Sequence, residues 1–163
     1  MYEHRWALMA ASLALVSASC QAPRPAEEPR QSEPAESGST AVLPLKEIMR
    51  ALEADLTEVA HGIWTEDHQA VRAGAGRIAD HPRVTPRQMG AIQTTLADEF
   101  PGFVQQDQAV HNTAVQLVEA VDAAQATGDL FRIYLRMQQG CMSCHTAFRA
   151  RVIEALYPEG GGG

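Results

Sequence analysis

The feature that most limits the fold of this chain is a helical spacing of apolar residues across residues 43–157. Apolar residues recur there in steps of three and four, which places them on one face of a helix. No segment sustains the two-residue alternation of a half-buried strand, so strands are not expected. The pattern predicts an all-α fold. Four main helices with short connections favour an antiparallel four-helix bundle.

Two helices are expected in the first half of this region. The apolar stripe of the first extends over residues 45–64. The second covers residues 67–79 and has a weaker pattern, because Gly74 and Gly76 interrupt it. It should end before Pro82, since the residue that precedes a proline disfavours the helical conformation.

A second group of helix signals begins at Thr85. Its hydroxyl can cap a third helix, and Gln88 has the spacing that completes a capping box. Pro101 should break or kink this segment. Gly128 should close it, and Asp129 should cap the last helix, which carries the final apolar stripe.

The N-terminal segment has the pattern of an export signal. A basic residue precedes the uncharged run from Trp6 to Val16, which is too short to span a bilayer and suits the apolar region of a signal peptide. Small residues then lead into Cys20, as they do before the lipidated cysteine of a lipoprotein. The alternative is plain secretion, with cleavage after Ala18 and Cys20 left as a thiol. We therefore expect residues 1–20 to act as a signal peptide of the lipoprotein type. Either interpretation directs the chain to the periplasm, and the lipoprotein interpretation adds a membrane anchor at Cys20.

Composition sets the remaining boundaries. Residues 21–42 are rich in Pro, Glu and Ser and have almost nothing to bury, which predicts a disordered linker. Residues 43–157 form the predicted helical domain. Residues 158–163 consist of proline, glutamate and glycine and are expected to form a flexible tail.

Charge and motif content exclude several classes of function. The chain has 13 basic and 20 acidic residues, a formal net charge of −7. Nucleic-acid binding is not expected, because contacts to phosphates need a basic patch. The sequence has no Ser/His/Asp constellation, phosphate-binding loop or paired-carboxylate site. An enzyme is therefore not expected.

The one specific chemical signal is the run from Cys141 to His145, Cys-Met-Ser-Cys-His. This C-x-x-C-H order is the attachment sequence for c-type haem. Each thiol can add across one haem vinyl group to form a thioether, and cysteines three residues apart share one face of a helix. The adjacent histidine can then ligate the iron. The motif predicts one covalent haem c, held by Cys141, Cys144 and His145.

Three other interpretations of the motif remain open. A zinc site would need further ligands from elsewhere, such as His61 or His111. A free redox pair of the thioredoxin kind is expected at a strand-to-helix junction, which the pattern lacks. The third alternative is a chance match inside a helix.

The setting of the motif resembles the class II cytochromes c, the cytochrome c′ family. In that family a C-x-x-C-H motif near the C-terminus is followed by an aromatic and a basic residue, here Phe148 and Arg149. The resemblance covers residues 43–157 and implies a four-helix bundle. It also implies a periplasmic one-electron carrier whose partners are periplasmic or membrane redox proteins. Arg149 lies one turn after His145, where it would screen a haem propionate or tune the imidazole, unless it is simply a solvated arginine.

The resemblance further implies what covers the opposite face of the haem. A methionine from the first helix gives a six-coordinate, low-spin carrier, whereas an apolar residue leaves the iron open to nitric oxide and carbon monoxide. Met49 lies on the apolar stripe early in the first helix, where Met-ligated members have theirs, so it is the expected sixth ligand. The alternatives are a core methionine at this position, ligation by Met89, or a bis-His site that includes His61 and His111.

The other histidines and the aromatic residues are assigned structural roles. His68 and His81 are expected at the surface or in turns, and His111 as a hydrogen-bonded core histidine. Members of the resembled family often dimerise through their first two helices, so the resemblance also raises a homodimer. Six aromatic residues are expected to pack the core and the haem edges: Trp64, Phe100, Phe103, Phe131, Tyr134 and Phe148.

Overall fold

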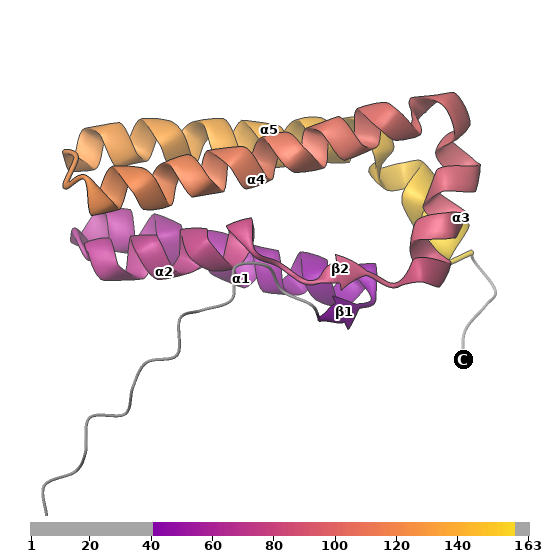
Figure 1. Cartoon of the computed structure of the whole chain (residues 1–163), viewed down its shortest axis with the longest axis horizontal. Helices are drawn as coiled ribbons and strands as arrows, with labels where there is room; N and C mark the ends of the chain where they lie inside the picture. Colours follow the sequence, from indigo (N-terminus) through magenta and orange to yellow (C-terminus); the bar gives the residue numbers. More distant parts are fainter. Residues whose placement is uncertain (1–40, 159–163) are drawn as a thin grey trace, which may run out of the picture. The chain divides into compact units, whose positions relative to one another are not determined.

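The computed structural model describes residues 41–158. The expected signal peptide with Cys20, the linker up to residue 40 and tail residues 159–163 lie outside this range. The described residues form five α-helices, one short 3-10 helix and two short strands, so the all-α expectation is confirmed. In chain order the elements are β1 (Val42–Leu43), α1 (Leu45–Thr65), α2 (His68–Ala79), β2 (Arg83–Val84), α3 (Pro86–Leu96), η1 (Ala97–Glu99), α4 (Phe100–Asp122) and α5 (Thr127–Leu156) (Figure 1).

The longer helices pack as neighbours along their lengths. Figure 1 shows α4 beside α5 and α1 beside α2, and α2 also contacts α4. Helix α3 lies across one end of this group and packs on α5. None of the helices formed by residues 41–158 is long and apolar enough to cross a membrane.

The first two helices begin and end within one residue of their expected positions. Helix α1 ends where Glu66 adopts the left-handed conformation, with a φ of 56°. Asp67 then caps α2, because its carboxylate accepts a hydrogen bond of 3.0 Å from the backbone N–H of Ala70. A two-residue connection therefore turns the chain back on itself between α1 and α2.

The start of α3 is confirmed, but half of the predicted capping box is wrong. The Thr85 hydroxyl accepts from the backbone N–H of Gln88 at 3.4 Å, as a helix cap should. The Gln88 side chain does not return to Thr85. Its Oε1 accepts instead from the backbone N–H of Leu45 at 2.8 Å, which links α3 to the start of α1.

The break after α3 comes before Pro101, not at it. Ala97 has a φ of 44° and ends α3, and η1 follows. Helix α4 then starts at Phe100, so Pro101 lies in its first turn, where the missing N–H of a proline costs nothing. The proline marks the start of a helix, which is the other position that proline favours.

The prediction for the last turn is also wrong in detail. Helix α4 ends at Asp122, and Ala124 has a φ of 50° in the turn that follows. Helix α5 begins at Thr127, so Gly128 and Asp129 both lie in its first turn. Asp129 is not the cap, but a carboxylate in the first turn still interacts favourably with the helix dipole.

The two short strands contradict the expectation that the chain forms none. Strand β1 pairs in parallel with β2. The backbone N–H of Arg83 donates to the carbonyl of Ala41 at 3.0 Å, and that of Thr85 donates to Leu43 at 3.2 Å. Strands of two residues are too short to show alternation, which explains why the sequence pattern missed them. Val42, assigned to the linker, therefore takes part in regular structure.

The buried apolar residues form two clusters. The main cluster joins α1, α2, α4 and α5, and the end cluster joins α3 to the second half of α5. The buried members of the main cluster are Val59, Ile63, Val71, Ala75, Ile78, Ala114, Leu117, Ala120, Leu130, Ile133 and Met137. The end cluster contains Ile92, Leu96, Phe148 and Val152, with Leu45, Val84, Phe100, Phe103, Cys144 and Leu156 packed against it.

The aromatic residues divide between core and surface. Phe103 and Phe148 meet edge to face in the end cluster, with ring centroids 5.7 Å apart, and Tyr134 packs against the main cluster. Trp64 is 78% exposed, and the neighbouring Phe131 is also exposed. The prediction of a core position is thus wrong for these two residues, both of which lie near a helix end.

Two glycines of α2 provide a matched test of how closely α1 and α2 pack. A Cβ at Gly74 would lie 2.9 Å from the carbonyl oxygen of Asp55 and 2.8 Å from Val59, whereas a Cβ at Gly76 would meet nothing within 4 Å. We expect Gly74→Ala to lower the free energy of unfolding by about 1–3 kcal/mol, because α1 and α2 must separate. Gly76→Ala should raise it by up to about 1 kcal/mol through helix propensity. Denaturant titration measures both, and equal effects would contradict the packing argument.

Candidate functional site

The C-x-x-C-H motif lies in the second half of α5. Cys141 and Cys144 are half-buried free thiols, and His145 is exposed. The two cysteines are one helical turn apart, so they share a side of α5 as the spacing predicted. Cys144 packs against the end cluster, next to the Phe103 and Phe148 pair.

Burial makes both thiols weak acids. Burial raises the pKa of the Cys141 thiol. The pKa of the Cys144 thiol is raised to about 11, mainly by burial and to a smaller extent by the charges of Asp107 and Cys141. A reactive redox cysteine needs the opposite, a pKa lowered toward neutrality. These cysteines are protonated at neutral pH, which argues against a free redox pair.

A glycine lets α4 and α5 approach closely beside the motif. A Cβ at Gly140 would lie only 2.9 Å from the side chain of Val110 in α4. Val110 packs against the main cluster, whereas Cys144 packs against the end cluster. The motif therefore starts where α5 passes from one cluster to the other.

Helices α1 and α4 make the same passage. On α1, Leu52 packs against the main cluster and Leu45 packs against the end cluster. On α4, Val110 packs against the main cluster and Phe103 packs against the end cluster. Between these positions on α4, Gln106 has a buried Oε1 atom with no hydrogen-bond partner. A buried polar atom without a partner is uncommon, and a bound water, ion or ligand group is one way to satisfy it.

Met49 occupies the corresponding place on α1. It follows Ile48, which is fully buried, but its own side chain is 38% exposed. The alternative of a core methionine is therefore wrong, even though Met49 lies on the apolar stripe of the sequence. Met89 is half-buried in α3, and Met137 is buried in the main cluster.

Arg149 is exposed, and a neighbouring arginine makes the contacts that the sequence did not anticipate. Arg151 lies over the ring of Phe148, with its guanidinium carbon 5.7 Å from the ring centroid. It also donates to the carboxylate of Glu99 at 3.1 Å. These contacts connect the C-terminal part of α5 to η1.

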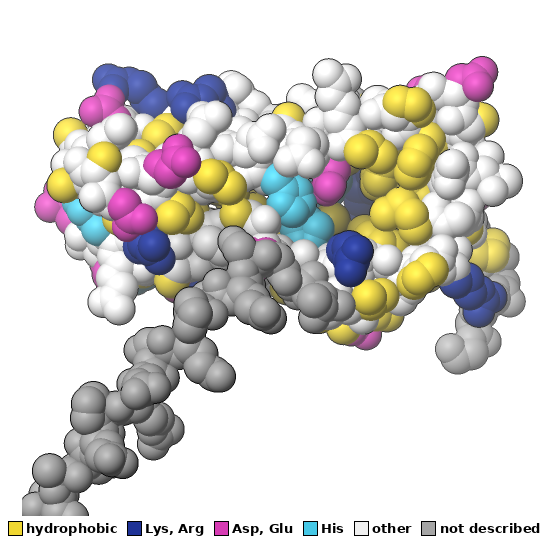
Figure 2. Space-filling model, in the orientation of Figure 1, with side chains coloured by type: hydrophobic (Ala, Val, Ile, Leu, Met, Phe, Trp, Pro, Cys, Tyr) yellow, Lys and Arg dark blue, Asp and Glu magenta, His cyan; other side chains and the backbone are white. Residues whose placement is uncertain are grey.

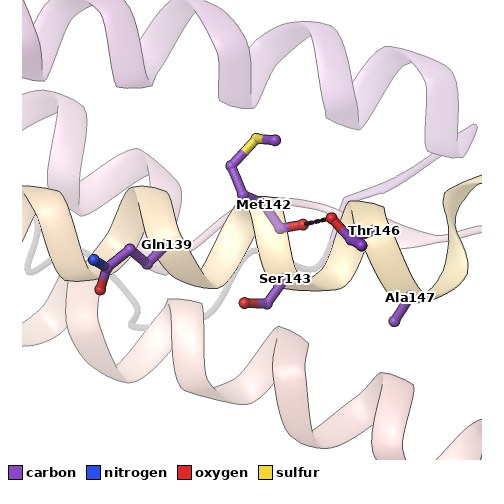
Figure 3. Close-up of a pocket in the computed structure, with 5 residues that line it drawn as sticks. All are labelled: Gln139, Met142, Ser143, Thr146 and Ala147. Carbon is purple, nitrogen blue, oxygen red and sulfur yellow. Dashed lines mark hydrogen bonds between the residues drawn. The ribbon is translucent and has the colours of Figure 1, made fainter.

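A shallow pocket follows the outer face of α5. Its lining comes from this one helix, and the Thr146 hydroxyl donates to the carbonyl of Met142 at 2.8 Å within it (Figure 3). Neither cysteine lines this pocket, and Met142 is 63% exposed. The middle of the motif thus belongs to the outer surface. The lining residues are Gln139, Met142, Ser143, Thr146 and Ala147.

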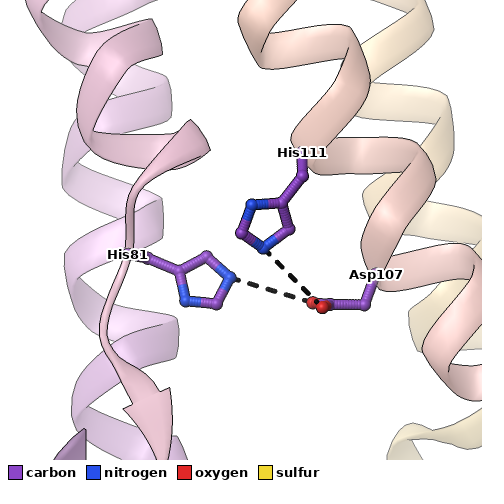
Figure 4. A group of neighbouring side chains, drawn as sticks. All are labelled: His81, Asp107 and His111. Atoms are coloured by element: carbon purple, nitrogen blue, oxygen red, sulfur yellow. Dashed lines mark ion pairs between the residues drawn. The ribbon is translucent and has the colours of Figure 1, made fainter. Parts of the chain in front are cut away.

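A second group of polar side chains lies between the α2–β2 connection and α4. His81 and His111 have ring centroids 4.4 Å apart, and both approach the carboxylate of Asp107 (Figure 4). The interaction with this carboxylate is the largest cause of the raised pKa of His81, whereas burial of the ring acts to lower that pKa. Figure 2 shows histidine side chains beside a hollow that is bordered by hydrophobic side chains (Figure 2).

Sequence reasoning missed this group. His81 does lie in a connection, as expected, but its side chain is only 15% exposed. The expected hydrogen bond of His111 is confirmed, because its Nδ1 lies 2.8 Å from the carbonyl oxygen of Ala79. The spacing of Asp107 and His111 places them on one face of α4, which was the available signal. The approach of His81 depends on tertiary packing and leaves no local pattern.

The zinc interpretation of the motif gains no support from this arrangement. His61 is exposed on α1. His111 belongs to a group with His81 and Asp107, and within residues 41–158 this metal-capable group includes neither cysteine. No protein-family profile, curated protein sequence or solved structure matches this chain.

Proposed function

We propose that this chain is a monohaem cytochrome c of the class II kind and acts as a one-electron carrier. Cys141 and Cys144 would hold the haem through thioethers, and His145 and Met49 would ligate the iron. The observation that carries the proposal is the C-x-x-C-H motif at the point where α5 passes between the two apolar clusters. When bound, the haem supplies an iron that cycles between the ferrous and ferric states.

The two thiols are suited to attachment. Addition of an S–H group across a vinyl group forms one C–S bond and one C–H bond, so attachment itself consumes no oxidant or reductant. Burial keeps both thiols protonated, because it raises the pKa of each. This also protects them from disulfide formation, which requires the thiolate.

The surroundings fit a large apolar group with a polar edge. Phe103 and Phe148 offer an apolar wall beside Cys144. The unpaired Oε1 of Gln106 and the part-exposed Met49 lie along the same passage on α4 and α1. Met49 would offer its thioether to the iron, and the Oε1 atom of Gln106 would offer a hydrogen-bond acceptor at this site. Arg149, on the exposed side of α5, is proposed to face a propionate.

The helix arrangement supports the bundle part of the proposal. We propose that α1, α2, α4 and α5 form an antiparallel four-helix bundle. Short connections join α1 to α2 and α4 to α5, while α2 packs on α4 and α1 contacts α5. Helix α3 is then the long return between the two helix pairs.

A second candidate function is a five-coordinate haem that binds nitric oxide or carbon monoxide. The observation that favours it is the 38% exposure of Met49, because a side chain free to move can leave the iron open. The two candidates differ only in the occupant of the sixth position.

The absorption spectrum of the purified protein, in both redox states, tests the proposal. A low-spin spectrum that carbon monoxide leaves nearly unchanged is expected for the His/Met carrier. A high-spin spectrum that shifts on carbon monoxide addition would favour the gas-binding candidate. A protein without a Soret band would contradict both.

The proposed location is the periplasm, with redox proteins there or in the membrane as partners. Residues 1–20 would act as the signal, and a lipid on Cys20 would anchor the domain. Fractionation of a Cys20→Ala variant checks the anchor, because the variant should move from the membrane to the soluble fraction. Dimerisation through α1 and α2 is proposed on the family resemblance.

A further inference from the structure

The imidazole rings of His81 and His111 are held in the same way by backbone carbonyls. Nδ1 of His81 lies 2.8 Å from the oxygen of Pro82, and Nδ1 of His111 lies 2.8 Å from the oxygen of Ala79. A carbonyl oxygen can only accept, so each Nδ1 must donate its hydrogen. In the neutral ring, Nε2 then carries the free lone pair. In metal-binding histidines, the ring nitrogen that does not bind the metal usually donates such a hydrogen bond, and this bond fixes the tautomer.

Both Nε2 atoms approach one carboxylate. Nε2 of His81 is 3.8 Å from Oδ1 of Asp107, and Nε2 of His111 is 3.7 Å from Oδ2 (Figure 4). These distances are longer than hydrogen bonds. Lone pairs that face a carboxylate repel it unless positive charge lies between them. A proton on each ring supplies that charge, but one metal cation satisfies all three groups at once.

The spacing of the three donor atoms suits a small transition-metal ion. One ligand atom from each residue lies within 4.8 Å of the others. Zinc binds nitrogen and oxygen at about 2.0–2.2 Å, so two donors on one tetrahedral ion lie about 3.4 Å apart. The two nitrogen–oxygen separations, 3.8 and 3.7 Å, exceed this value by a few tenths of an ångström, and the ligand nitrogens of the two imidazole rings lie within 4.8 Å of each other. Side-chain rotations would bring the donors together. Two imidazoles with one carboxylate favour zinc or a similar ion over calcium or magnesium.

From this geometry we propose that His81, Asp107 and His111 bind one divalent transition-metal ion of the zinc type. Three protein ligands leave one coordination position open to water or another ligand. The side chain of Asp107 is 52% exposed, which gives the ion a path from solvent. None of the three residues belongs to the C-x-x-C-H motif, although Asp107 lies near enough to Cys144 to raise the pKa of its thiol. The ion would join the α2–β2 connection to α4.

Zinc content per chain tests the site. Untagged full-length protein is stripped with a chelator, dialysed to equilibrium against zinc, and analysed for zinc and iron in the same sample. Wild type should bind one zinc per chain. His81→Gln, Asp107→Asn and His111→Gln should each weaken zinc binding by at least about tenfold. The iron content reports haem separately and should be equal in all samples.

Matched controls use exposed residues outside the group. His61→Gln in α1 and Asp98→Asn in η1 should bind zinc like wild type. Asp107→Asn is nearly isosteric at a half-exposed position, so its fold should persist, and circular dichroism checks this. Failure of wild type to bind zinc would overturn the proposal. So would undiminished binding in Asp107→Asn, or binding that disappears only when Cys141 and Cys144 are replaced.

Discussion

Replacement of both Cys141 and Cys144 with alanine should abolish covalent haem attachment. Wild type should keep its colour after extraction with acidified acetone, because thioether bonds survive denaturation. The double variant should be colourless after the same treatment, and each single variant should keep at most one thioether. The haemochrome spectrum of the extracted pellet measures the difference. Loss of all haem from wild type would contradict the assignment of haem c.

The middle of the motif supplies the control for this experiment. Met142 is 63% exposed and lines the outer pocket of α5 with Ser143, away from the apolar clusters. Met142→Leu and Ser143→Ala should therefore leave the haem content unchanged. If these control variants also lost haem, the loss would be caused by disturbance of the helix and not by removal of the two thiols.

Met49→Leu should remove the sixth ligand and change the spectrum from low spin to high spin. The weak near-infrared band of a Met–iron bond should disappear, and carbon monoxide and nitric oxide should bind. The reduction potential should fall, because a methionine ligand raises it. The fold should persist, since exchanges between leucine and methionine usually cost less than about 1.5 kcal/mol. Spectroscopy and redox titration measure these effects.

Two other methionines serve as matched controls. Met89 is half-buried in α3, and Met142 is exposed on the far side of the motif. Met89→Leu and Met142→Leu should leave the spectrum unchanged. An unchanged spectrum in Met49→Leu would assign the ligand elsewhere, with Met89 and His111 next to test. A wild type that is already high spin would support the gas-binding candidate.

Local signals predicted the helices well where the deciding interactions were local. The stripe of α1 and the cap of α3 by Thr85 each depend on residues within four positions of one another. The predictions that were wrong concern contacts between distant residues, or residues whose type is compatible with more than one position in a helix. Gln88 bonds to Leu45 across the fold, and a proline such as Pro101 fits the start of a helix as well as its end.

The same division applies to the candidate site. The spacing of Cys141, Cys144 and His145 is a local pattern, so the haem hypothesis can be drawn from the sequence alone. The meeting of His81 with Asp107 and His111 is not local, because β1 pairing with β2 and α2 packing on α4 bring the histidine to its place. A two-residue strand and a close helix contact leave no periodic signal.

The division of the apolar interior into two clusters has a consequence for the order in which the chain matures. The end cluster has four buried residues against eleven in the main cluster, so we expect its opening to expose less apolar surface than unfolding of the main cluster would. The main cluster can then stay folded while α3 and the C-terminal part of α5 open. Such an opening brings Cys144 into solvent without global unfolding. Under the proposed function, such an opening would present Cys144 for haem attachment, and the cluster would close again afterwards.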